Sequence, residues 1–311
     1  MRGTSNEGQE EAEEHEALEN LSLEENNPAP PPPPGLIHPD ISLGLERFCV
    51  PVFNTVDDTR LTVGNFAYTN RVLDSQGICK EHRTVLVDGC VCGRSCLTMD
   101  CCCSTIPYSD DGRLPMDQLN SEEYIASSKN TGVIFECAEA CECSLQCGNR
   151  VAQKGAVHPV QIYRTEKKGW AVRTVDALPI GTFVGEYTGE LKNEGDGSGE
   201  YLFETKIGEM SCTIDAKVFG NFTRFVNHSC SPNLYATSIV WDDATEPYVH
   251  ICFFTLNDVE PGAELTVDYG SEWWRENIYK FPCRCGSSNC GFNEVERDKV
   301  LMLAEGSISS L

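Results

Sequence analysis

Cysteine is the residue that most constrains what this chain can fold into. The 311 residues contain 18 cysteines, most of them in tight groups. The chain starts with a Glu-rich stretch that lacks the apolar core of a signal peptide, and no run of about 18 apolar residues predicts a membrane span. We therefore expect a soluble, intracellular protein in a reducing compartment, where cysteines this dense are more often metal ligands than disulfides.

The first two cysteine groups have the spacing of metal ligands. They read Cys90-x-Cys92-x3-Cys96-x4-Cys101-x-Cys103 and Cys137-x3-Cys141-x-Cys143-x3-Cys147. A Cys-x-Cys pair rarely closes a disulfide on itself, whereas its thiolates can bind one metal or two adjacent ones. Zinc suits an all-thiolate tetrahedral site. Three such ions need about twelve sulfur bonds, which nine thiolates supply if three of them bridge, so the sequence predicts a three-zinc cluster.

A third group, Cys283-x-Cys285-x4-Cys290, offers only three ligands. A structural zinc there needs a fourth ligand from elsewhere in the chain, and Cys230 is the candidate. The other cysteines are most simply buried small apolar groups or spare thiols: Cys49, Cys79, Cys102, Cys212 and Cys252. Cys102 stays open as a ligand, because it or a neighbour in the triplet could fill the central position.

The chain is strongly acidic. Its 24 Lys and Arg against 48 Asp and Glu give a formal net charge of −24 and a pI near 4.5. This charge balance argues against extensive binding to the phosphate backbone of nucleic acids and favours a basic partner. Residues 1–35 hold nine Glu, one Arg and a proline run, and we expect a disordered acidic tail there. That tail carries −8, so −16 belongs to residues 36–311.

Short β-strands bounded by Gly, Pro and Asp dominate the rest of the pattern. We expect them at Phe48–Phe53, Val85–Val87, Val160–Tyr163, Trp170–Arg173, Phe183–Tyr187, Tyr201–Phe203, Val249–Phe254 and Glu264–Val267. Residues 104–136 read as a loop held at both ends, and Asn293–Ala304 as a solvated surface helix. No internal repeat is visible. The pattern predicts a mainly β fold with few helices.

Four ordered motifs accompany the cysteines: Lys168-Gly169-Trp170, Tyr187-Thr188-Gly189-Glu190, Arg224-Phe225-Val226-Asn227-His228-Ser229-Cys230 and Leu265-Thr266-Val267-Asp268-Tyr269-Gly270. Together with the two metal frameworks they resemble the SET-domain protein lysine methyltransferases of the suppressor-of-variegation class, over about residues 89–292. The resemblance implies a SET-domain fold of several small sheets with a knot-like crossing, flanked by a pre-SET three-zinc cluster and a post-SET zinc site.

The resemblance also implies a division of the chain. After the tail (1–35) come an N-terminal scaffold segment (36–88), a pre-SET zinc-cluster domain (89–150), a SET catalytic domain (151–270), and a post-SET zinc segment with the C-terminal tail (271–311). The crossing would bring Asn227-His228 beside Asp268-Tyr269. The post-SET zinc would fold residues 283–292 over the active site, with Phe292 helping to close it.

The implied activity is transfer of a methyl group from S-adenosylmethionine to the ε-amine of a lysine, in this class usually the ninth residue of the tail of histone H3. The resemblance places the donor pocket at Lys168, Gly169, Trp170, Tyr201, Arg224, Asn227 and His228. The target lysine would enter from the other face through a channel containing the catalytic residues Tyr187 and Tyr269, with Val267 and Phe225 beside them.

Methyl transfer suits these residue types. It is an in-line displacement, so most of the barrier reduction must come from holding amine, methyl and sulfonium in line. The lysine must arrive neutral although its free pKa is about 10.4. Desolvation in the channel and the nearby sulfonium charge should favour loss of the proton. Tyr269 can orient the amine with its hydroxyl.

Three features depart from the family pattern. Ala171 stands where Gly usually follows Trp170, which puts a methyl group near the donor. Val267 stands where Phe or Tyr usually limits the number of methyl groups, so we expect di- or trimethyl-lysine as the product. The stretch between Glu190 and Tyr201 is only ten residues long, shorter than in relatives, and leaves the choice of substrate open.

Three functions remain open at this stage: a histone methyltransferase, a methyltransferase for a non-histone protein, and a catalytically silent zinc-scaffolded chromatin adaptor. The first implies a basic histone tail as partner, a place in the nucleus on chromatin, and a monomer without sequence-specific nucleic-acid or membrane binding. Metal-bound thiols are deprotonated, so the cluster would add −3 and the fourth site −2, taking the formal −24 to about −29. Such acidity suits a tail rich in Lys and Arg.

Overall fold

Short strands build the folded part of the chain. The structure is a computed structural model and describes residues 32–61, 66–81, 89–92, 96, 101, 103, 108–119, 133–196, 199–207, 210–241 and 248–308. Contacts divide the chain into Met1–Pro34 and Gly35–Leu311, and the second unit holds every element described below. Most of the predicted tail and Val85–Val87 lie outside the described residues.

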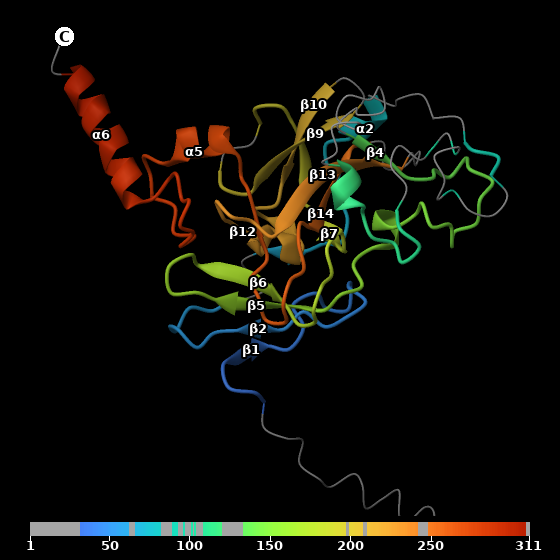
Figure 1. Ribbon diagram of the computed structural model, residues 1–311, viewed down its shortest axis with the longest axis horizontal. Coiled ribbons are helices and arrows are strands. Elements are labelled where there is room, and N and C mark those ends of the chain that lie inside the picture. The colour runs from blue at the N-terminus through green and yellow to red at the C-terminus, as the bar shows by residue number, and fades with distance from the viewer. Residues whose placement is uncertain are drawn as a thin grey trace, which may run out of the picture. The chain divides into compact units, whose positions relative to one another are not determined.

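Three sheets make up most of this unit (Figure 1). The first has the order β1-β2-β5-β6, formed by β1 (Leu36–His38), β2 (Val52–Phe53), β5 (Val160–Arg164) and β6 (Trp170–Thr174). The second is antiparallel with the order β8-β10-β9, formed by β8 (Glu190–Asn193), β10 (Met210–Asp215) and β9 (Leu202–Ile207). The third has the order β4-β13-β14-β7, formed by β4 (Val133–Phe135), β13 (Leu234–Val240), β14 (His250–Thr255) and β7 (Phe183–Glu186).

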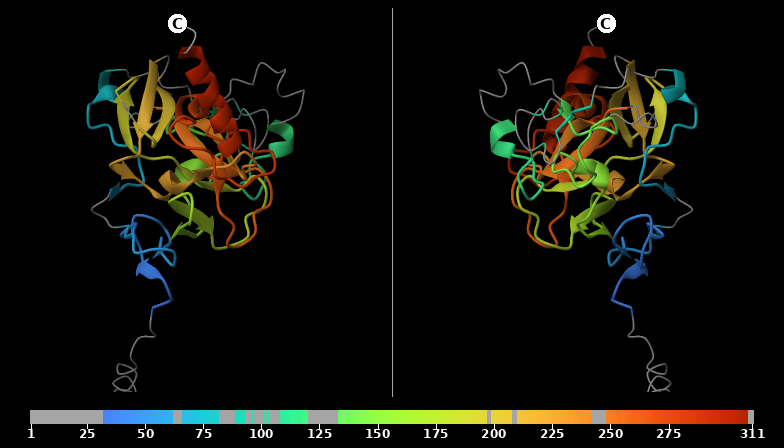
Figure 2. Two further views of the ribbon diagram at one scale, coloured as in Figure 1. Left: turned by 90° about the vertical axis from the view of Figure 1, so that its left-hand side faces the viewer. Right: turned by 90° about the vertical axis from the view of Figure 1, so that its right-hand side faces the viewer.

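Two short parallel pairs tie distant segments together. They join β3 (Ala67–Tyr68) to β11 (Phe219–Gly220), and β12 (Asn227–His228) to β15 (Thr266–Val267). The longest described helix is α6 (Glu294–Ile308), drawn in red in Figure 2. The others are the short α2 (Ile78–Glu81), α3 (Met116–Leu119) and α5 (Ser271–Asn277), with the 3-10 turns η1 (Ala152–Lys154) and η2 (Phe222–Phe225). This mostly β architecture with few helices confirms the predicted fold class.

Strand β14 is buried on both faces, which explains its near-continuous apolar sequence. All six of its residues are buried. Because alternate side chains of a strand point to opposite faces, Phe253 packs in the larger hydrophobic core and Phe254 in the smaller one. Pairing of β7 with β14 continues beyond β7, since the Tyr187 backbone N–H donates to the Ile251 carbonyl at 2.8 Å. The strand thus positions Tyr187 against the larger core.

The predicted strands are largely present with shifted ends. β5, β6, β7 and β14 lie where the pattern places them, β2 and β15 are shorter than predicted, and β9 is longer. Helix α6 confirms the prediction for Asn293–Ala304. The prediction of a loop over 104–136 is wrong in part, because α3 and β4 lie within it. β4 pairs in parallel with β13, a partner distant in sequence that no local pattern could indicate.

Glu136 follows β4 and is a buried carboxylate, only 3% exposed. Its Oε1 accepts hydrogen bonds from Tyr108 Oη at 2.8 Å and from the backbone N–H groups of Val151 and Ala152 at 3.0 and 2.7 Å. Its Oε2 accepts hydrogen bonds from the backbone N–H and the side-chain Nε2 of Gln153, at 3.3 and 2.9 Å. The carboxylate satisfies the free N–H groups at the start of η1, and so links the cysteine-rich segment to the strands that follow it.

We expect Glu136→Ala to lower the free energy of unfolding by about 3 kcal/mol, because several buried donors lose a charged acceptor. Glu139→Ala changes an exposed residue of the same segment and is the matched control. Denaturant unfolding of both variants, at equal zinc content, measures the difference. A loss for Glu136→Ala no larger than that of the control would show that the carboxylate does not stabilise this junction.

Candidate active site and metal centres

A crossing of two distant segments forms the centre of the site. β12 pairs in parallel with β15, which sets His228 opposite Val267. The side chain of Asn233 reinforces this pairing. Its Nδ2 donates to the Glu264 backbone carbonyl at 2.8 Å, and its Oδ1 accepts from the Thr266 backbone N–H at 2.8 Å. The crossing brings the Asn227-His228 motif beside the segment that ends at Tyr269.

Four of the predicted donor residues lie around this crossing or bond to it. Gly169 lies at the turn between β5 and β6 with φ of +75°, a backbone conformation that favours glycine. Asn227 Nδ2 donates to the Trp170 backbone carbonyl at 3.1 Å and to Glu264 Oε1 at 3.1 Å. The other carboxylate oxygen of Glu264 pairs with Lys168 Nζ. Glu264, which is not among the predicted site residues, therefore joins two donor motifs.

Arg224 lies in an aromatic cage. Its guanidinium carbon is 4.1, 4.7 and 4.8 Å from the ring centres of Tyr201, Phe66 and Phe225 respectively. Its Nε donates to the Ala216 carbonyl at 2.7 Å. The cage brings the predicted donor residues Arg224 and Tyr201 together and places Phe225 in the buried core beside them. Phe66 was missed, because only the pairing of β3 with β11 brings that segment here.

The two predicted catalytic tyrosines commit their hydroxyl protons to backbone carbonyls. Tyr187 Oη donates to the Tyr201 carbonyl at 2.8 Å, and Tyr269 Oη donates to the Val226 carbonyl at 2.9 Å. Burial raises the pKa of both phenols well above 10, so both stay protonated at neutral pH. Each phenol oxygen keeps lone pairs that can accept a hydrogen bond.

His228 is buried and neutral. Burial lowers its pKa to about 4, against the opposing effect of Asp268. Its Nδ1 accepts the backbone N–H of Tyr269 at 3.1 Å, so in the neutral ring Nε2 carries the proton and donates it to Cys230 Sγ at 3.2 Å. The 3.5 Å approach of Nδ1 to Asp268 is therefore not an ion pair. The His228 ring thus connects Cys230, a predicted metal ligand, to the backbone of Tyr269, a predicted catalytic residue.

The two residues that depart from the family pattern are buried in strands. Ala171 is fully buried in β6, opposite Tyr163 of β5. Val267 is 4% exposed in β15. Their effects on donor affinity and on the methylation product remain predictions.

The nine predicted cluster ligands gather in one place. Three sets of four sulfurs lie within 4.8 Å of one another: Cys90, Cys92, Cys96 and Cys101; Cys90, Cys96, Cys137 and Cys143; and Cys90, Cys103, Cys137 and Cys141. Cys96 and Cys137 occur in two sets each and Cys90 in all three, as expected where thiolates are shared between ions, whereas Cys147 packs in the same cluster but belongs to none of these sets. A tetrahedron of sulfurs around zinc has edges of about 3.8 Å, and the Cys90–Cys96 and Cys103–Cys141 sulfurs are 3.6 and 3.4 Å apart. The residues fit the three-zinc cluster. Cys102 lies outside the described residues.

Two side chains that follow Cys147 support the cluster. Asn149 Nδ2 donates to Cys137 Sγ at 3.4 Å, and Arg150 Nη2 donates to Cys143 Sγ at 3.7 Å and to the Ala138 carbonyl at 2.7 Å. Both side chains are buried, at 0% and 4% exposure. The Arg150 cation offsets part of the negative charge that a thiolate-rich cluster carries.

The fourth site joins the active-site crossing to the C-terminal segment. Its predicted ligands lie within 4.8 Å of one another: Cys230, Cys283, Cys285 and Cys290. The Cys230 and Cys290 sulfurs are 3.8 Å apart, the edge length expected around zinc. The set fits one tetrahedral ion.

A pair of tryptophans on α5 fills the space between this site and the crossing. Trp274 is 3% exposed and stacks on Phe292 with ring centres 5.2 Å apart. It also packs edge-on to His228, with ring centres 5.0 Å apart. Trp273 packs edge-on to Tyr269 at 4.9 Å. The adjacent tryptophans after Gly270 are a sequence signal for this packing, but they belong to none of the predicted motifs.

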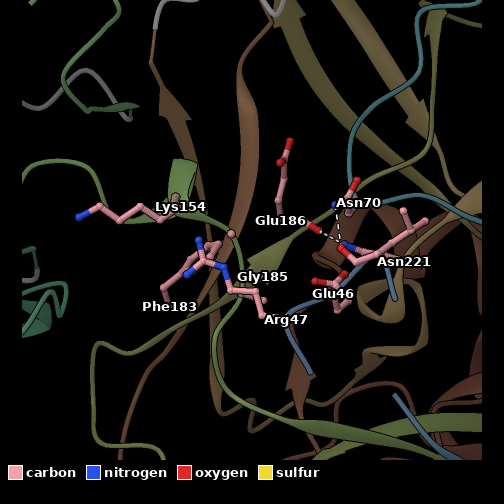
Figure 3. A pocket seen from close by; sticks show the side chains of 12 residues that line it. Glu46, Arg47, Asn70, Lys154, Phe183, Gly185, Glu186 and Asn221 are labelled. Carbon is pink, nitrogen blue, oxygen red and sulfur yellow. Dashed lines mark hydrogen bonds between the residues drawn. The ribbon is translucent and has the colours of Figure 1, made fainter. Parts of the chain in front are cut away.

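A cavity of about 130 Å³ lies elsewhere, between residues 45–47, Asn70, η1, β7 and Asn221. Figure 3 shows Glu46, Arg47 and Lys154 among the residues that line it. On its wall, Asn221 Nδ2 donates to the Glu186 carbonyl at 2.9 Å. None of the predicted donor or channel residues lines this cavity. In the described parts of the chain, no helix has the length and apolarity to cross a membrane.

Comparison with known families agrees with this geometry. A model of the SET domain matches residues 169–270, and a model of the Pre-SET motif matches residues 42–150. The chain therefore belongs to the SET-domain family, among the members that carry a Pre-SET motif. The predicted domain boundaries inside the chain remain predictions.

Individual relatives match most of this chain in sequence. Histone-lysine N-methyltransferase EHMT1 of Mus musculus is 36% identical over 261 residues, which are 81% of this chain and 19% of that protein. The H3 lysine-9 specific SUVH3 of Arabidopsis thaliana is 34% identical over 295 residues, 83% of this chain and 43% of that protein. The chain thus spans between about a fifth and two fifths of these curated relatives.

Several solved structures have a similar fold. KRYPTONITE in complex with mCHH DNA, H3(1-15) peptide and SAH superposes with a TM-score of 0.68 at 31% identity. The match covers 85% of this chain and 55% of that one.

The two metal centres should be separable. We expect the purified protein to hold four zinc ions and Cys285→Ser to hold three, because the fourth site shares no ligand with the cluster. Cys49→Ser, at an exposed position outside both clusters, is the matched control and should keep all four. Plasma mass spectrometry of gel-filtered protein counts the ions. A Cys285→Ser protein with unchanged zinc would contradict the assignment.

Proposed function

We propose that this chain is an S-adenosylmethionine-dependent lysine methyltransferase that acts on a histone tail, at lysine nine of histone H3. The observation that supports it most is the crossing of β12 and β15, which joins Asn227 and His228 to Tyr269. The relatives support the substrate class, since EHMT1 is a histone-lysine N-methyltransferase and SUVH3 is H3 lysine-9 specific.

The contacts around the crossing support a donor site there. S-adenosylmethionine, when bound, supplies a methyl group on a positively charged sulfur. The residues that would hold it are Lys168, Gly169, Trp170, Tyr201, Arg224, Asn227 and His228. Hydrogen bonds and the aromatic cage fix several of these side chains before any ligand arrives, which lowers the entropic cost of binding.

Tyr187 and Tyr269 would orient the lysine amine. A neutral amine must keep its lone pair free to attack, so the surrounding groups should accept its hydrogen bonds rather than donate to it. Both phenols already donate their protons to backbone carbonyls, and their oxygens therefore face an amine as acceptors. Burial in this setting also favours loss of the lysine proton before transfer.

A histone tail suits the charge of the protein. The chain carries a formal −24, and metal-bound thiolates deepen this charge, which attracts a peptide rich in Lys and Arg. Such a partner places the protein on chromatin in the nucleus. We propose that the chain acts as a monomer. The KRYPTONITE complex holds DNA as well as a histone peptide, and the match covers 55% of the chain in that structure.

Methylation of a peptide panel tests the proposal. With labelled S-adenosylmethionine, we expect transfer to an H3 peptide that contains lysine nine and none when that lysine is replaced by arginine. Tyr269→Phe should lower kcat on the order of a hundredfold, because the amine loses an orienting acceptor. Transfer only to other proteins would indicate a non-histone enzyme. Saturable donor binding without any transfer would leave the substrate unidentified, and no donor binding would indicate a silent adaptor.

The product should reach di- or trimethyl-lysine, because Val267 lies two residues before Tyr269 and is smaller than Phe or Tyr. Val267 lies in the larger hydrophobic core and Tyr269 packs against the same core, which supports a common space for the two side chains. We expect Val267→Tyr to stop the product at monomethyl-lysine. Mass spectrometry of peptide at exhaustive turnover measures both enzymes. Monomethyl product from the unchanged protein would contradict this prediction.

A further inference from the structure

Glu264 is the one carboxylate that touches two of the donor motifs in the described residues. Its Oε2 pairs with Lys168 Nζ from the β5–β6 turn, and its Oε1 accepts from Asn227 Nδ2 at 3.1 Å. Its backbone is fixed as well, by Asn233 Nδ2 at 2.8 Å and by a bridge to Arg173. The side chain is 20% exposed, as is that of Lys168, so the pair lies at the rim of the site rather than in the core.

The position of Glu264 decides which way the Asn227 amide faces. An asparagine amide has two N–H donors on one end and one carbonyl acceptor on the other. The nitrogen end of Asn227 meets two acceptors, Glu264 Oε1 and the Trp170 carbonyl, each at 3.1 Å. A flipped amide would set its oxygen against both of them. The carbonyl Oδ1 must therefore face away, and no described residue donates to it.

We propose that Glu264 is a positioning residue that holds Asn227 Oδ1 ready to accept the α-ammonium group of the methyl donor. This inference rests on the proposed function, since it specifies the part of the donor that the crossing recognises. The amino-acid end of S-adenosylmethionine is the part that carries an ammonium group. Lys168 anchors the other oxygen of Glu264, so the carboxylate cannot turn away from Asn227.

Only a carboxylate can serve both neighbours. A carboxamide has one acceptor oxygen, so in Glu264→Gln its NH2 end must face either Lys168 or Asn227, which are both donors. The variant keeps the volume of the side chain and removes one negative charge. Glu260→Gln makes the same chemical change in an exposed turn four residues earlier and touches no donor residue, so it is the matched control.

The binding of two nucleosides distinguishes a positioning role of Glu264 from a general disturbance of the site. S-adenosylhomocysteine carries the amino-acid end, whereas 5′-methylthioadenosine has the same adenosine and thioether without it. By calorimetry, we expect Glu264→Gln to bind S-adenosylhomocysteine about tenfold more weakly. Its affinity for 5′-methylthioadenosine should change by less than about twofold, and Glu260→Gln should match the unchanged protein for both ligands.

If Glu264→Gln weakens the binding of both nucleosides equally, the residue only maintains the fold. If the variant leaves the binding of both unchanged, the residue has no part in recognition. Either result overturns the inference and leaves the proposed function intact. If the unchanged protein binds neither nucleoside, the proposed function and this inference fail together. In turnover, the variant should raise the donor KM while kcat and the peptide KM stay within about twofold.

Discussion

The parallel pairing of β12 with β15 is the contact on which the site depends. Each strand is two residues long, and a ladder this short is not stable by itself in water. Burial of Val226, Leu265 and Val267 in the larger core supports it. The side-chain amide of Asn233, which follows β12 in the chain, adds two hydrogen bonds to the segment that contains β15. The crossing is therefore maintained by packing and by side chains, and its backbone ladder alone would not hold it.

Local sequence patterns predicted the parts of the structure that depend on local chemistry. The cysteine spacings indicated both metal centres, and apolar runs indicated β5, β6, β7 and β14. Long-range pairing could not be found in this way. β4 owes its strand form to β13, and Phe66 reaches Arg224 only because β3 pairs with β11. No spacing in the sequence indicates such partners.

The site residues divide in the same way, into those that a sequence motif indicates and those that only the three-dimensional arrangement reveals. Tyr187, Asn227, His228 and Tyr269 stood out because they belong to motifs. Glu264 belongs to no such motif. Its role arises because the fold brings it into contact with Lys168 and Asn227, which lie in two different motifs. The tryptophans of α5 were likewise overlooked, since adjacent aromatic residues are common in cores. Their importance comes from their packing against His228 and Tyr269.

The fourth metal site has a physical route to the chemistry that the three-metal cluster lacks. A thiolate on zinc is a stronger acceptor than a thiol, so metal binding should strengthen the bond from His228 Nε2–H to Cys230 Sγ. That bond fixes the tautomer in which Nδ1 accepts the Tyr269 backbone N–H. The same metal gathers Cys283, Cys285 and Cys290, and so holds Phe292 against Trp274. The cluster, by contrast, reaches the strands through Arg150 and the segment that Glu136 anchors, so its effect on the site is through the stability of the scaffold.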